Sequence, residues 1–345
     1  MKCFIQFCFL KKNNKITIHD ISKHLGIDSS TVSRALNDSS RVTQKTKDRI
    51  ITTANELGYQ RNSLASKLRT NKSNTIGVIV PRISRHFFSS VIAGIEETAY
   101  DAGYDVMICQ SLESLEREKK LVGTLLSNRV DGILISISME TNNYGHFDAY
   151  ENHGFPILFF DRPCRLDKNT NVIIDDFKAS FESTEHLITV GKKSIVHLSG
   201  PQNLDLYKNR KAGYIAALEK HGLKIDESYV LESQLMKEDG EGLAKKILSL
   251  PVVDAVFSAN DTAAISVIQA LKEKGKKIPE DIAFVGFSNE PISAVIEPSL
   301  TTVSQPDFEM GKVATELLLN QIKNKPTVNE IKVLKPKLII RDSSK

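Results

Sequence analysis

Short apolar runs alternate with longer amphipathic segments from Thr75 almost to the end of the chain. The apolar runs are 76–80, 104–109, 132–137, 157–160, 172–174, 194–198, 255–258 and 282–287. The amphipathic segments are 88–102, 114–126, 177–190, 210–221 and 262–274. Buried parallel strands joined by crossover helices fit this alternation, because such strands are covered on both faces. The pattern predicts a doubly wound α/β architecture, and a length of about 270 residues suits two similar lobes better than one sheet.

Polar or aromatic pairs follow the predicted strands. The pairs are Phe87 and Phe88, Asp161 and Arg162, Asp175 and Asp176, Asn260 and Asp261, and Ser288 and Asn289. In open α/β sheets, ligands bind outside the carboxyl ends of the strands. Carboxylates, amides, an arginine and aromatic rings suit a polyhydroxyl ligand, whose hydroxyls need donors and acceptors and whose ring needs an apolar wall. Each residue alone could equally cap a helix or fill the core, so only the recurrence favours a binding site.

Residues 17–37 contain two short amphipathic segments joined at Gly26, and a third helical segment follows at about 44–57. Asp20 and Ser29 stand where helix N-caps are expected. The apolar residues fall at spacings that place them on one buried side: Ile21, Leu25, Ile27, Val32 and Leu36. The arrangement predicts a helix-turn-helix whose ligand is the DNA major groove. The alternative is an ordinary surface helix of a three-helix domain.

The charge distribution favours the DNA-binding interpretation. Residues 1–72 contain 14 Lys and Arg against 5 Asp and Glu, whereas the remainder contains 32 basic and 37 acidic residues. A basic module on a mildly acidic body is typical of a phosphate-binding head. The polar side chains of the second helix, among them Arg34, can bond base edges or phosphates, and the Arg34 guanidinium matches guanine O6 and N7.

The composition is that of an ordinary globular protein of two or three domains, with 345 residues of which 41% are hydrophobic. The four cysteines have neither disulfide-framework density nor metal-ligand spacing, which fits a reducing compartment and predicts a cytoplasmic protein without a metal site. The apolar run 3–10 is too short for a signal peptide and lacks a cleavage site, so residues 1–15 are expected to be a disordered extension or an overextended gene start.

Catalytic signatures are missing from the sequence. We find no nucleophile elbow, no Walker A loop, no His-Glu-x-x-His and no Gly-x-Gly-x-x-Gly, and Gly191-Lys-Lys-Ser194 lacks the spacing of a phosphate loop. The sequence therefore argues against a sugar-modifying enzyme and predicts no cofactor. The basic head argues against an extracellular solute-binding protein, which the core alone would suit.

Over roughly residues 16–343, the chain resembles bacterial transcriptional regulators of the lac repressor and galactose repressor type. The motifs that carry the resemblance are Thr17-Ile-x-Asp-Ile, Gly26-Ile, Thr31-Val-Ser-Arg34, Asn62-x-x-Ala65-x-x-Leu68, Asn128-Arg-Val-Asp-Gly132, Phe160-Asp161-Arg162, Arg210-x-x-Gly213-Tyr214, Ala259-Asn-Asp261, Ile278-Pro-x-Asp-Ile282, Val285-Gly-Phe287 and Thr301-Thr-Val-x-Gln-Pro306. The resemblance implies a helix-turn-helix domain at 16–61, a hinge helix and linker at 62–74, and a two-lobed core at 75–345 shaped like a periplasmic sugar-binding protein. Lobe 1 is expected at about 75–173 plus 304–325, and lobe 2 at about 174–303 plus 326–345.

The resemblance also implies a repressor that binds double-stranded operator DNA as a homodimer. Bases would be read by Ser29, Ser30 and Arg34, and phosphates held by Thr17, Thr31, Ser33 and Asn37. Asn62, Ala65 and Leu68 lie in the hinge helix, where Leu68 would wedge into the minor groove. The chain ends at Lys345 without leucine heptads beyond the core, so a dimer is expected and not a tetramer.

A small-molecule effector, expected to be a carbohydrate, would bind between the lobes and control operator affinity. Its predicted ligands are Phe87, Phe88, Asp161, Arg162, Asp176, Arg210, Asn260, Asp261 and Gln305, with Ser288 at the edge. Ser288 stands where the family commonly has aspartate, which puts a standard sugar-binding scheme in doubt there. The alternative is control by a protein corepressor, although Glu316 occupies the place of a docking arginine.

Overall fold

The structure, a computed structural model, describes residues 16–59, 72–324 and 329–345. It divides the chain into two compact units, Met1–Asn71 and Lys72–Lys345. The predicted extension 1–15 and the predicted hinge residues Asn62, Ala65 and Leu68 lie outside the described residues.

The first unit contains the three helices α1 (Ile18–Leu25), α2 (Ser29–Leu36) and α3 (Gln44–Glu56). Ile21 and Val32 are fully buried between these helices. The other predicted core residues, Leu25, Ile27 and Leu36, are partly buried and pack against the same cluster. Gly26 ends α1 with φ 63°, a left-handed conformation that glycine adopts without steric cost. The predicted helix-turn-helix is confirmed.

The predicted N-cap of α1, Asp20, is wrong by three residues, and that of α2, Ser29, is wrong by one. Thr17 caps α1, and its side chain forms a reciprocal capping box with Asp20, the third residue of the helix. Asp28 caps α2, with its carboxylate accepting a hydrogen bond from the Ser30 N–H at 2.7 Å. Both helices therefore begin earlier than expected, because a carboxylate at Asp28 and a hydroxyl at Thr17 reach the free amides first.

The second unit is built on two six-stranded sheets, which define lobe 1 and lobe 2. The lobe 1 sheet has the order β11-β5-β4-β3-β1-β2 and the lobe 2 sheet the order β12-β10-β9-β8-β6-β7. Pairing is parallel except between β10 and β12. The strands are β1 (Thr75–Val80), β2 (Asp105–Gln110), β3 (Gly132–Ile135), β4 (Ile157–Phe160), β5 (Asn171–Ile174), β6 (Ile195–Ser199), β7 (Val230–Glu232), β8 (Ala255–Ser258), β9 (Ala283–Phe287), β10 (Thr301–Ser304), β11 (Ile331–Leu334) and β12 (Lys337–Ile339).

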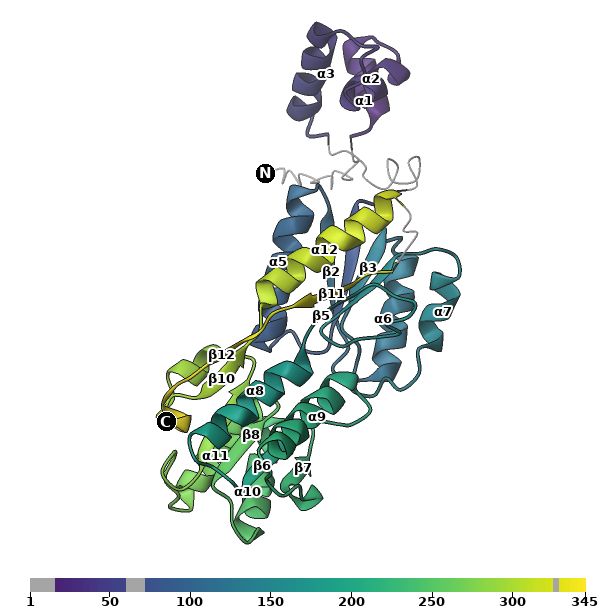
Figure 1. Cartoon of the computed structure of the whole chain (residues 1–345). Helices are drawn as coiled ribbons and strands as arrows, with labels where there is room; N and C mark the ends of the chain where they lie inside the picture. Colours follow the sequence, from purple (N-terminus) through teal and green to yellow (C-terminus); the bar gives the residue numbers. More distant parts are fainter. Residues whose placement is uncertain (1–15, 60–71, 325–328) are drawn as a thin grey trace, which may run out of the picture. The chain divides into compact units, whose positions relative to one another are not determined.

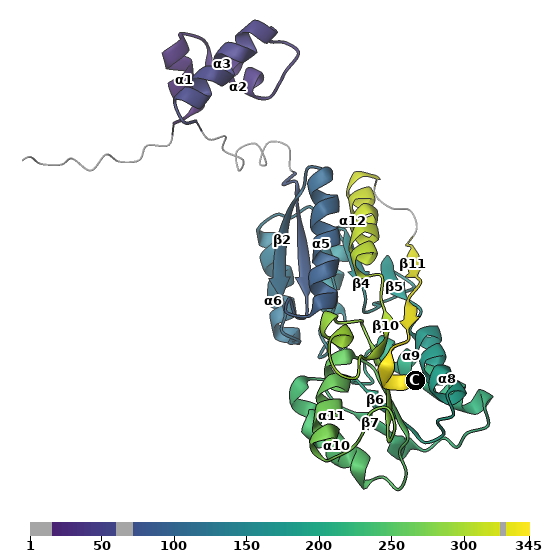
Figure 2. The same cartoon turned by 90° about the vertical axis from the view of Figure 1, so that its left-hand side faces the viewer.

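Helices cover both faces of each sheet (Figures 1 and 2). They are α5 (His86–Asp101), α6 (Leu115–Ser127), α7 (Gly145–Glu151), α8 (Asp176–Thr189), α9 (Asp205–Lys220), α10 (Gly240–Ser249), α11 (Asp261–Glu273) and α12 (Asp307–Asn324). In lobe 1, α5 and α12 pack on the face that carries Val78 and Leu134, and α6 packs on the face that carries Ile79 and Ile133. The predicted doubly wound α/β architecture is confirmed.

The chain crosses between the lobes at three places, after β5, after β10 and after β11. The predicted assignment of 326–345 to lobe 2 is therefore wrong for β11, which pairs in parallel with β5 in the lobe 1 sheet. β11 is thus the edge strand of the lobe 1 sheet beside β5, and the chain then passes to β12 in lobe 2. Only residues from Lys337 onward join the lobe 2 sheet.

Close helix packing in lobe 1 depends on glycine. A Cβ atom at Gly94 of α5 would overlap the carbonyl oxygen of Phe308 on α12, and one at Gly311 of α12 would overlap the carbonyl oxygen of Val91. The two helix backbones thus approach each other where neither carries a side chain.

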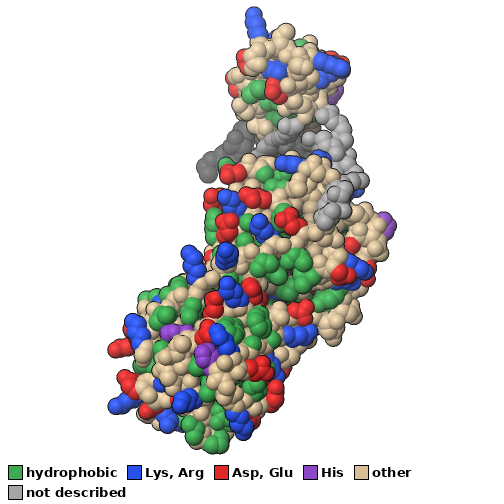
Figure 3. Space-filling model, viewed as in Figure 1, with side chains coloured by type: hydrophobic (Ala, Val, Ile, Leu, Met, Phe, Trp, Pro, Cys, Tyr) green, Lys and Arg blue, Asp and Glu red, His purple; other side chains and the backbone are tan. Residues whose placement is uncertain are grey.

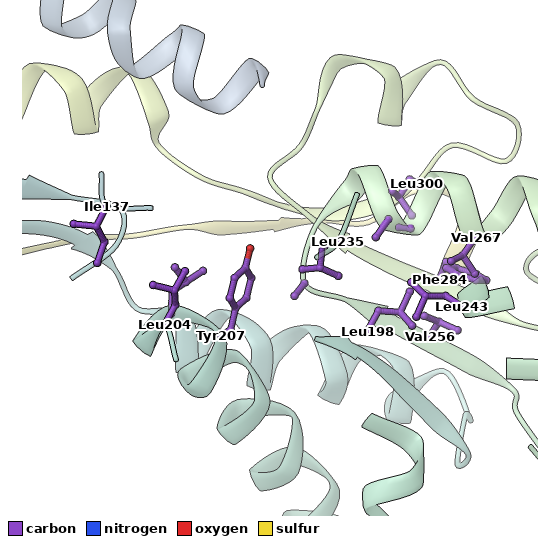
Figure 4. Packing of buried hydrophobic residues seen from close by; sticks show 14 of the residues in the cluster. Ile137, Leu198, Leu204, Tyr207, Leu235, Leu243, Val256, Val267, Phe284 and Leu300 are labelled. Carbon is purple, nitrogen blue, oxygen red and sulfur yellow. The ribbon is translucent and has the colours of Figure 1, made fainter. Parts of the chain in front are cut away.

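An apolar cluster continues from one lobe into the other. It runs from Ile137 of lobe 1, past Leu204 and Tyr207, to the lobe 2 core around Val256 and Phe284 (Figure 4). The interface between the lobes is thus partly apolar.

Candidate functional site

Helix α2 presents a polar surface of the kind that the sequence predicts. Ser30, Arg34 and Asn37 are exposed, whereas Ser29, Thr31 and Ser33 are half-buried. Thr17 is exposed at the start of α1.

Two residues of the α2 surface already have intramolecular partners. The Ser29 hydroxyl donates to the Ser22 hydroxyl at 2.9 Å, and the Asn37 amide donates to the Ser33 carbonyl at 2.6 Å. The Ser29 hydroxyl and the Asn37 amide are therefore held in place on the surface that carries Arg34.

A cleft with about 650 Å³ of empty space, open solvent at its mouth included, lies between the lobes. It is lined from lobe 1 by Arg82, Arg85, Phe87, Phe88, Glu113, Met139, Asp161 and Arg162, and from lobe 2 and the crossing segments by Leu206, Tyr207, Arg210, Gln234, Met236, Ala259, Asn260, Asp261, Thr262, Ser288, Glu290 and Gln305. Most of these residues follow the carboxyl ends of strands, as the topology requires. The cleft brings together every predicted effector ligand except Asp176.

Arg162 is fixed in the lobe 1 wall by Glu113. Its Nη1 and Nη2 atoms donate to the two Glu113 carboxylate oxygens at 2.7 and 3.0 Å, and Nη1 also donates to the Ile137 carbonyl at 2.6 Å. Burial alone would raise the pKa of Glu113, but the charge and hydrogen bonds of Arg162 outweigh it and lower that pKa. The Asp161 side chain, 11% exposed, lies beside this pair and accepts from the Ser136 hydroxyl at 3.2 Å, and burial raises its pKa.

Arg210 is fixed in the same manner from lobe 2. Its Nε donates to Asp176 at 2.7 Å, its Nη1 donates to the Ala259 carbonyl at 2.7 Å, and its guanidinium lies 3.6 Å above the ring centre of Phe287. Burial raises the pKa of Asp176 to about 6, against the opposing charge of Arg210. Asp176, predicted as a ligand, therefore contacts Arg210 and does not line the cleft.

Asn260 and Asp261 serve the fold as well as the cleft. The Asn260 side chain caps α11 and donates to the Leu235 carbonyl at 3.0 Å. The buried Asp261 carboxylate accepts from the Thr302 hydroxyl at 2.6 Å and from the Glu290 N–H at 2.8 Å. Burial raises the pKa of Asp261 to about 6, and the Thr302 hydrogen bond opposes that shift.

Phe87 and Phe88 form an apolar part of the wall. Each is 6% exposed, and their rings meet edge to face with centroids 5.1 Å apart. Across the cleft, the Gln305 amide donates to the Ser288 hydroxyl at 3.1 Å, and the buried Gln305 Oε1 has no partner among the described residues.

Backbone strain gathers at this cleft. Glu113, Asp161 and Ser288 have φ values of 63°, 63° and 112°, in the left-handed region that side chains other than glycine rarely adopt. Such strained positions concentrate at binding sites, because the surrounding structure must hold them there.

The lobes are joined directly across the cleft. The Arg85 guanidinium of lobe 1 donates to the Thr262 hydroxyl of lobe 2, and to the Met236 sulfur at 3.4 Å. The Asn203 amide of lobe 2 also donates to the Met139 carbonyl of lobe 1 at 2.6 Å.

Several lining residues were not predicted. Glu113 and Arg82 follow β2 and β1, so the strand-end rule that identified Asp161 could have found them. Tyr207 precedes Arg210 by one helical turn on α9 and shares its face. Gln234 and Met236 follow the short strand β7, whose apolar signal is too weak to predict.

Other kinds of site are not apparent in the described part of the chain. Across residues 16–59, 72–324 and 329–345, no cluster of His, Cys, Asp and Glu could hold a metal ion. The helices described there include none that is both long and apolar enough to span a membrane.

Two family models match the chain. The model for bacterial regulatory proteins of the lacI family matches residues 17–62. The model for periplasmic binding proteins and the sugar binding domain of the LacI family matches residues 73–339. The junction between the two matches falls close to the division between the two compact units.

Individual proteins agree with this assignment. The chain is 32% identical to the HTH-type transcriptional repressor CytR of Escherichia coli (strain K12), over 97% of this chain and 98% of that protein. A lac repressor dimer bound to operator and the anti-inducer ONPF matches with a TM-score of 0.85 and 26% identity, over 96% of this chain and 99% of that chain. The complex of the transcriptional regulator CelR with cellobiose matches with a TM-score of 0.73 and 26% identity, over 95% and 99%.

These relatives are transcriptional regulators and not enzymes, which agrees with the missing catalytic motifs. The three-helix head, the two-lobed core and the full-length matches together show that the chain belongs to the lacI family of bacterial regulatory proteins, DNA-binding transcriptional repressors controlled by a small molecule.

Proposed function

We propose that a sugar or sugar derivative binds in the interlobe cleft and controls operator binding by this repressor. The observation that carries the proposal is the convergence of paired donors and acceptors from both lobes on one cleft beside an aromatic wall. The cellobiose bound by CelR supports the same ligand class.

The cleft chemistry suits a polyhydroxyl ring. Arg162 with Asp161, and Arg210 with Asn260, offer donors beside acceptors, as a hydroxyl requires. Phe87 and Phe88 offer apolar surface to the ring face. Because the guanidinium groups are held by Glu113 and Asp176, they need little reorganisation when a ligand arrives.

Control follows from the contributions of both lobes. A ligand that touches lobe 1 through Arg162 and lobe 2 through Arg210 and Asp261 has different contacts in different lobe arrangements. Such a ligand shifts the equilibrium between these arrangements by its difference in affinity for them. The lobe arrangement is therefore the element through which effector binding would reach the DNA-binding unit.

On DNA, a dimer would bind a roughly palindromic operator, as the operator-bound lac repressor dimer suggests. Ser29, Ser30 and Arg34 would read bases, and Thr17, Thr31, Ser33 and Asn37 would mostly hold phosphates. The exposure of Ser30 and Arg34 supports the base-reading role. Leu68 would supply the minor-groove wedge, with Asn62 and Ala65 in the same hinge segment.

A ligand screen on the full-length repressor tests the proposal. Pentoses, hexoses, disaccharides and their acidic derivatives are screened by thermal shift, and those that stabilise the protein are added to the operator complex in a fluorescence anisotropy titration. We expect one compound to raise the melting temperature and to change the operator affinity. Arg210→Ala should remove both of these effects.

Lys211→Ala is the matched control, because Lys211 lies beside Arg210 on α9 but pairs with Glu227 away from the cleft. This variant should show the same thermal shift and the same change in operator affinity as the parent. A compound that changes operator affinity equally in the parent and in Arg210→Ala would contradict binding in this cleft.

A further inference from the structure

The guanidinium groups that line the interlobe cleft are of two kinds. Arg162 and Arg210 each hold a protein carboxylate and a backbone carbonyl. Arg82 and Arg85 line the same cleft, yet neither forms an ion pair with any residue in 16–59, 72–324 or 329–345. The cleft therefore contains two positive charges that the described protein groups do not neutralise directly.

Within the described ranges, Arg82 has no hydrogen-bond or ion-pair partner. Its Nε atom is buried without a hydrogen bond among the described residues. The carboxylate that it influences is Glu113, whose pKa it helps to lower. Both oxygens of Glu113 are already taken, by the Arg162 guanidinium and the Met139 N–H. Arg82 thus retains donors that a bound group could use.

In the part of the chain that the structure describes, Arg85 has only neutral partners, the Thr262 hydroxyl and the Met236 sulfur. It is also the N-cap residue of α5, and no side chain of the described residues caps the first amides of that helix. A helix N-terminus carries a partial positive charge and free N–H groups, both of which favour an anion. The segment from β1 to α5 therefore presents two guanidinium groups next to an uncapped helix start.

The opposite wall has the opposite character. Asp261 and Glu290 line it from lobe 2, and the Asp261 oxygens are occupied by Thr302 and the Glu290 N–H. A ligand with several negative charges would be repelled there. A ligand with hydroxyl groups toward lobe 2 and one negative charge toward Arg82 and Arg85 matches both walls.

We propose that Arg82 and Arg85 bind an anionic group, a carboxylate or a phosphate, carried by the polyhydroxyl effector. This inference rests on the proposed function of the cleft and narrows its ligand class to acidic sugar derivatives. An unpaired guanidinium in a partly desolvated cleft is costly, and an anionic ligand group offsets that cost with charge-assisted hydrogen bonds.

The test is calorimetric titration of the full-length protein with matched neutral and anionic compounds at constant ionic strength. The probes are D-glucose, D-glucuronate and D-glucose 6-phosphate, together with D-ribose and D-ribose 5-phosphate. We expect at least one anionic compound to bind about tenfold or more tightly than its neutral parent. Preference for glucuronate would identify a carboxylate ligand, and preference for a phosphate ester would identify a phosphate ligand.

Three variants then test whether Arg82 and Arg85 cause the preference for the anionic compound: Arg82→Gln, Arg85→Gln and the double variant. Each single change should lower the ratio of anionic to neutral affinity several-fold, and the double variant should bring it near one. Arg117→Gln removes the same charge from an exposed position on α6 and should leave the ratio unchanged. Thr262→Val removes the hydrogen bond from Arg85 to Thr262 while keeping the Arg85 charge, so the ratio of anionic to neutral affinity should survive whatever happens to overall affinity.

The inference is overturned if no anionic compound binds more tightly than its parent, or if the preference persists in the double variant. In the first case, neutral binding that Arg210→Ala abolishes would leave the proposed function standing. If none of the probes binds and the wider sugar screen is also negative, both proposals fail.

Discussion

Asp176 holds Arg210 through a single carboxylate oxygen, which lies 2.7 Å from both Nε and Nη2 of the guanidinium. Asp176 does not line the cleft, so it would act on a ligand only by orienting Arg210. Both side chains are buried, and removal of one would leave the charge of the other uncompensated. Conservative variants are therefore the informative ones.

Arg210→Lys should abolish the effector response and leave operator affinity without effector unchanged. Lysine keeps the charge but cannot reach Asp176 and the Ala259 carbonyl together and still present donors to a ligand. Operator titrations with and without effector measure both quantities. A normal response in this variant would show that the guanidinium geometry is unimportant.

Asp261→Asn should change how the unfolding free energy depends on pH. The carboxyl pKa is about 6 in the folded protein and 3.8 in the unfolded chain, so the folded state binds the proton more tightly. The stability that this proton contributes is complete below pH 3.8 and is lost as pH rises through 6. The parent should thus lose stability over this range while the variant does not. In urea unfolding, the unfolding free energy of Asp261→Asn minus that of the parent should rise by up to about 3 kcal/mol between pH 4 and 7.

Asp226→Asn is the control for that experiment. The pKa of this exposed carboxyl is lowered to about 2 by its hydrogen bonds with Ser228, so it stays ionised throughout the range. Its substitution should give a nearly flat difference between pH 4 and 7, because the unfolded chain, with the ordinary pKa of 3.8, takes up only part of a proton at pH 4 and none above pH 5. A flat difference for Asp261→Asn as well would mean that the Asp261 pKa is not raised.

Arg34→Ala should cost about 1 to 3 kcal/mol of operator binding and relax the preference at one base pair in each half-site. Arg34 is exposed on α2, so the head should remain folded. Thr31→Ala, a predicted phosphate contact, should instead weaken operator and random DNA alike. Equal losses on both DNAs for Arg34→Ala would refute base reading.

Leu68→Ser should weaken operator binding and reduce DNA bending while sparing effector binding. A serine cannot supply the apolar wedge that offsets the cost of unstacking the central base step. Gel-shift assays on circularly permuted operator fragments measure affinity and bending together. A variant that bends DNA as the parent does would exclude the wedge.

Much of the architecture could be predicted from periodicity. Ile21 and Val32 lie where the helical spacing places them, and β1 and β4 coincide with apolar runs that are buried on both faces. β11 escaped prediction because its residues are mostly exposed and its strand is short. Its place in the sheet depends on pairing with β5, which lies far away in the sequence.

The position of the cleft could be predicted from the sequence, but the contacts of its individual residues could be predicted only in part. The strand-end rule brought Asp161 and Asp261 to the cleft, but it could not distinguish Asp176, which turns toward Arg210. The ion pair between Glu113 and Arg162 could not be predicted from the sequence either, because the two residues come from separate loops. On the face of the core that Figure 3 shows, acidic and basic side chains are mixed, so net charge gives no sign that Arg82 and Arg85 lack carboxylate partners among the described residues.

Effector binding in the interlobe cleft is tested most directly by calorimetric titration of the full-length protein with the sugar that gives the largest thermal shift. The titration is repeated on Arg210→Ala and Asp261→Ala, with Lys211→Ala as the control. We predict one binding site per chain in the parent and the control, and affinity at least tenfold weaker in each cleft variant. Binding that survives both cleft substitutions unchanged would place the effector elsewhere and contradict the account.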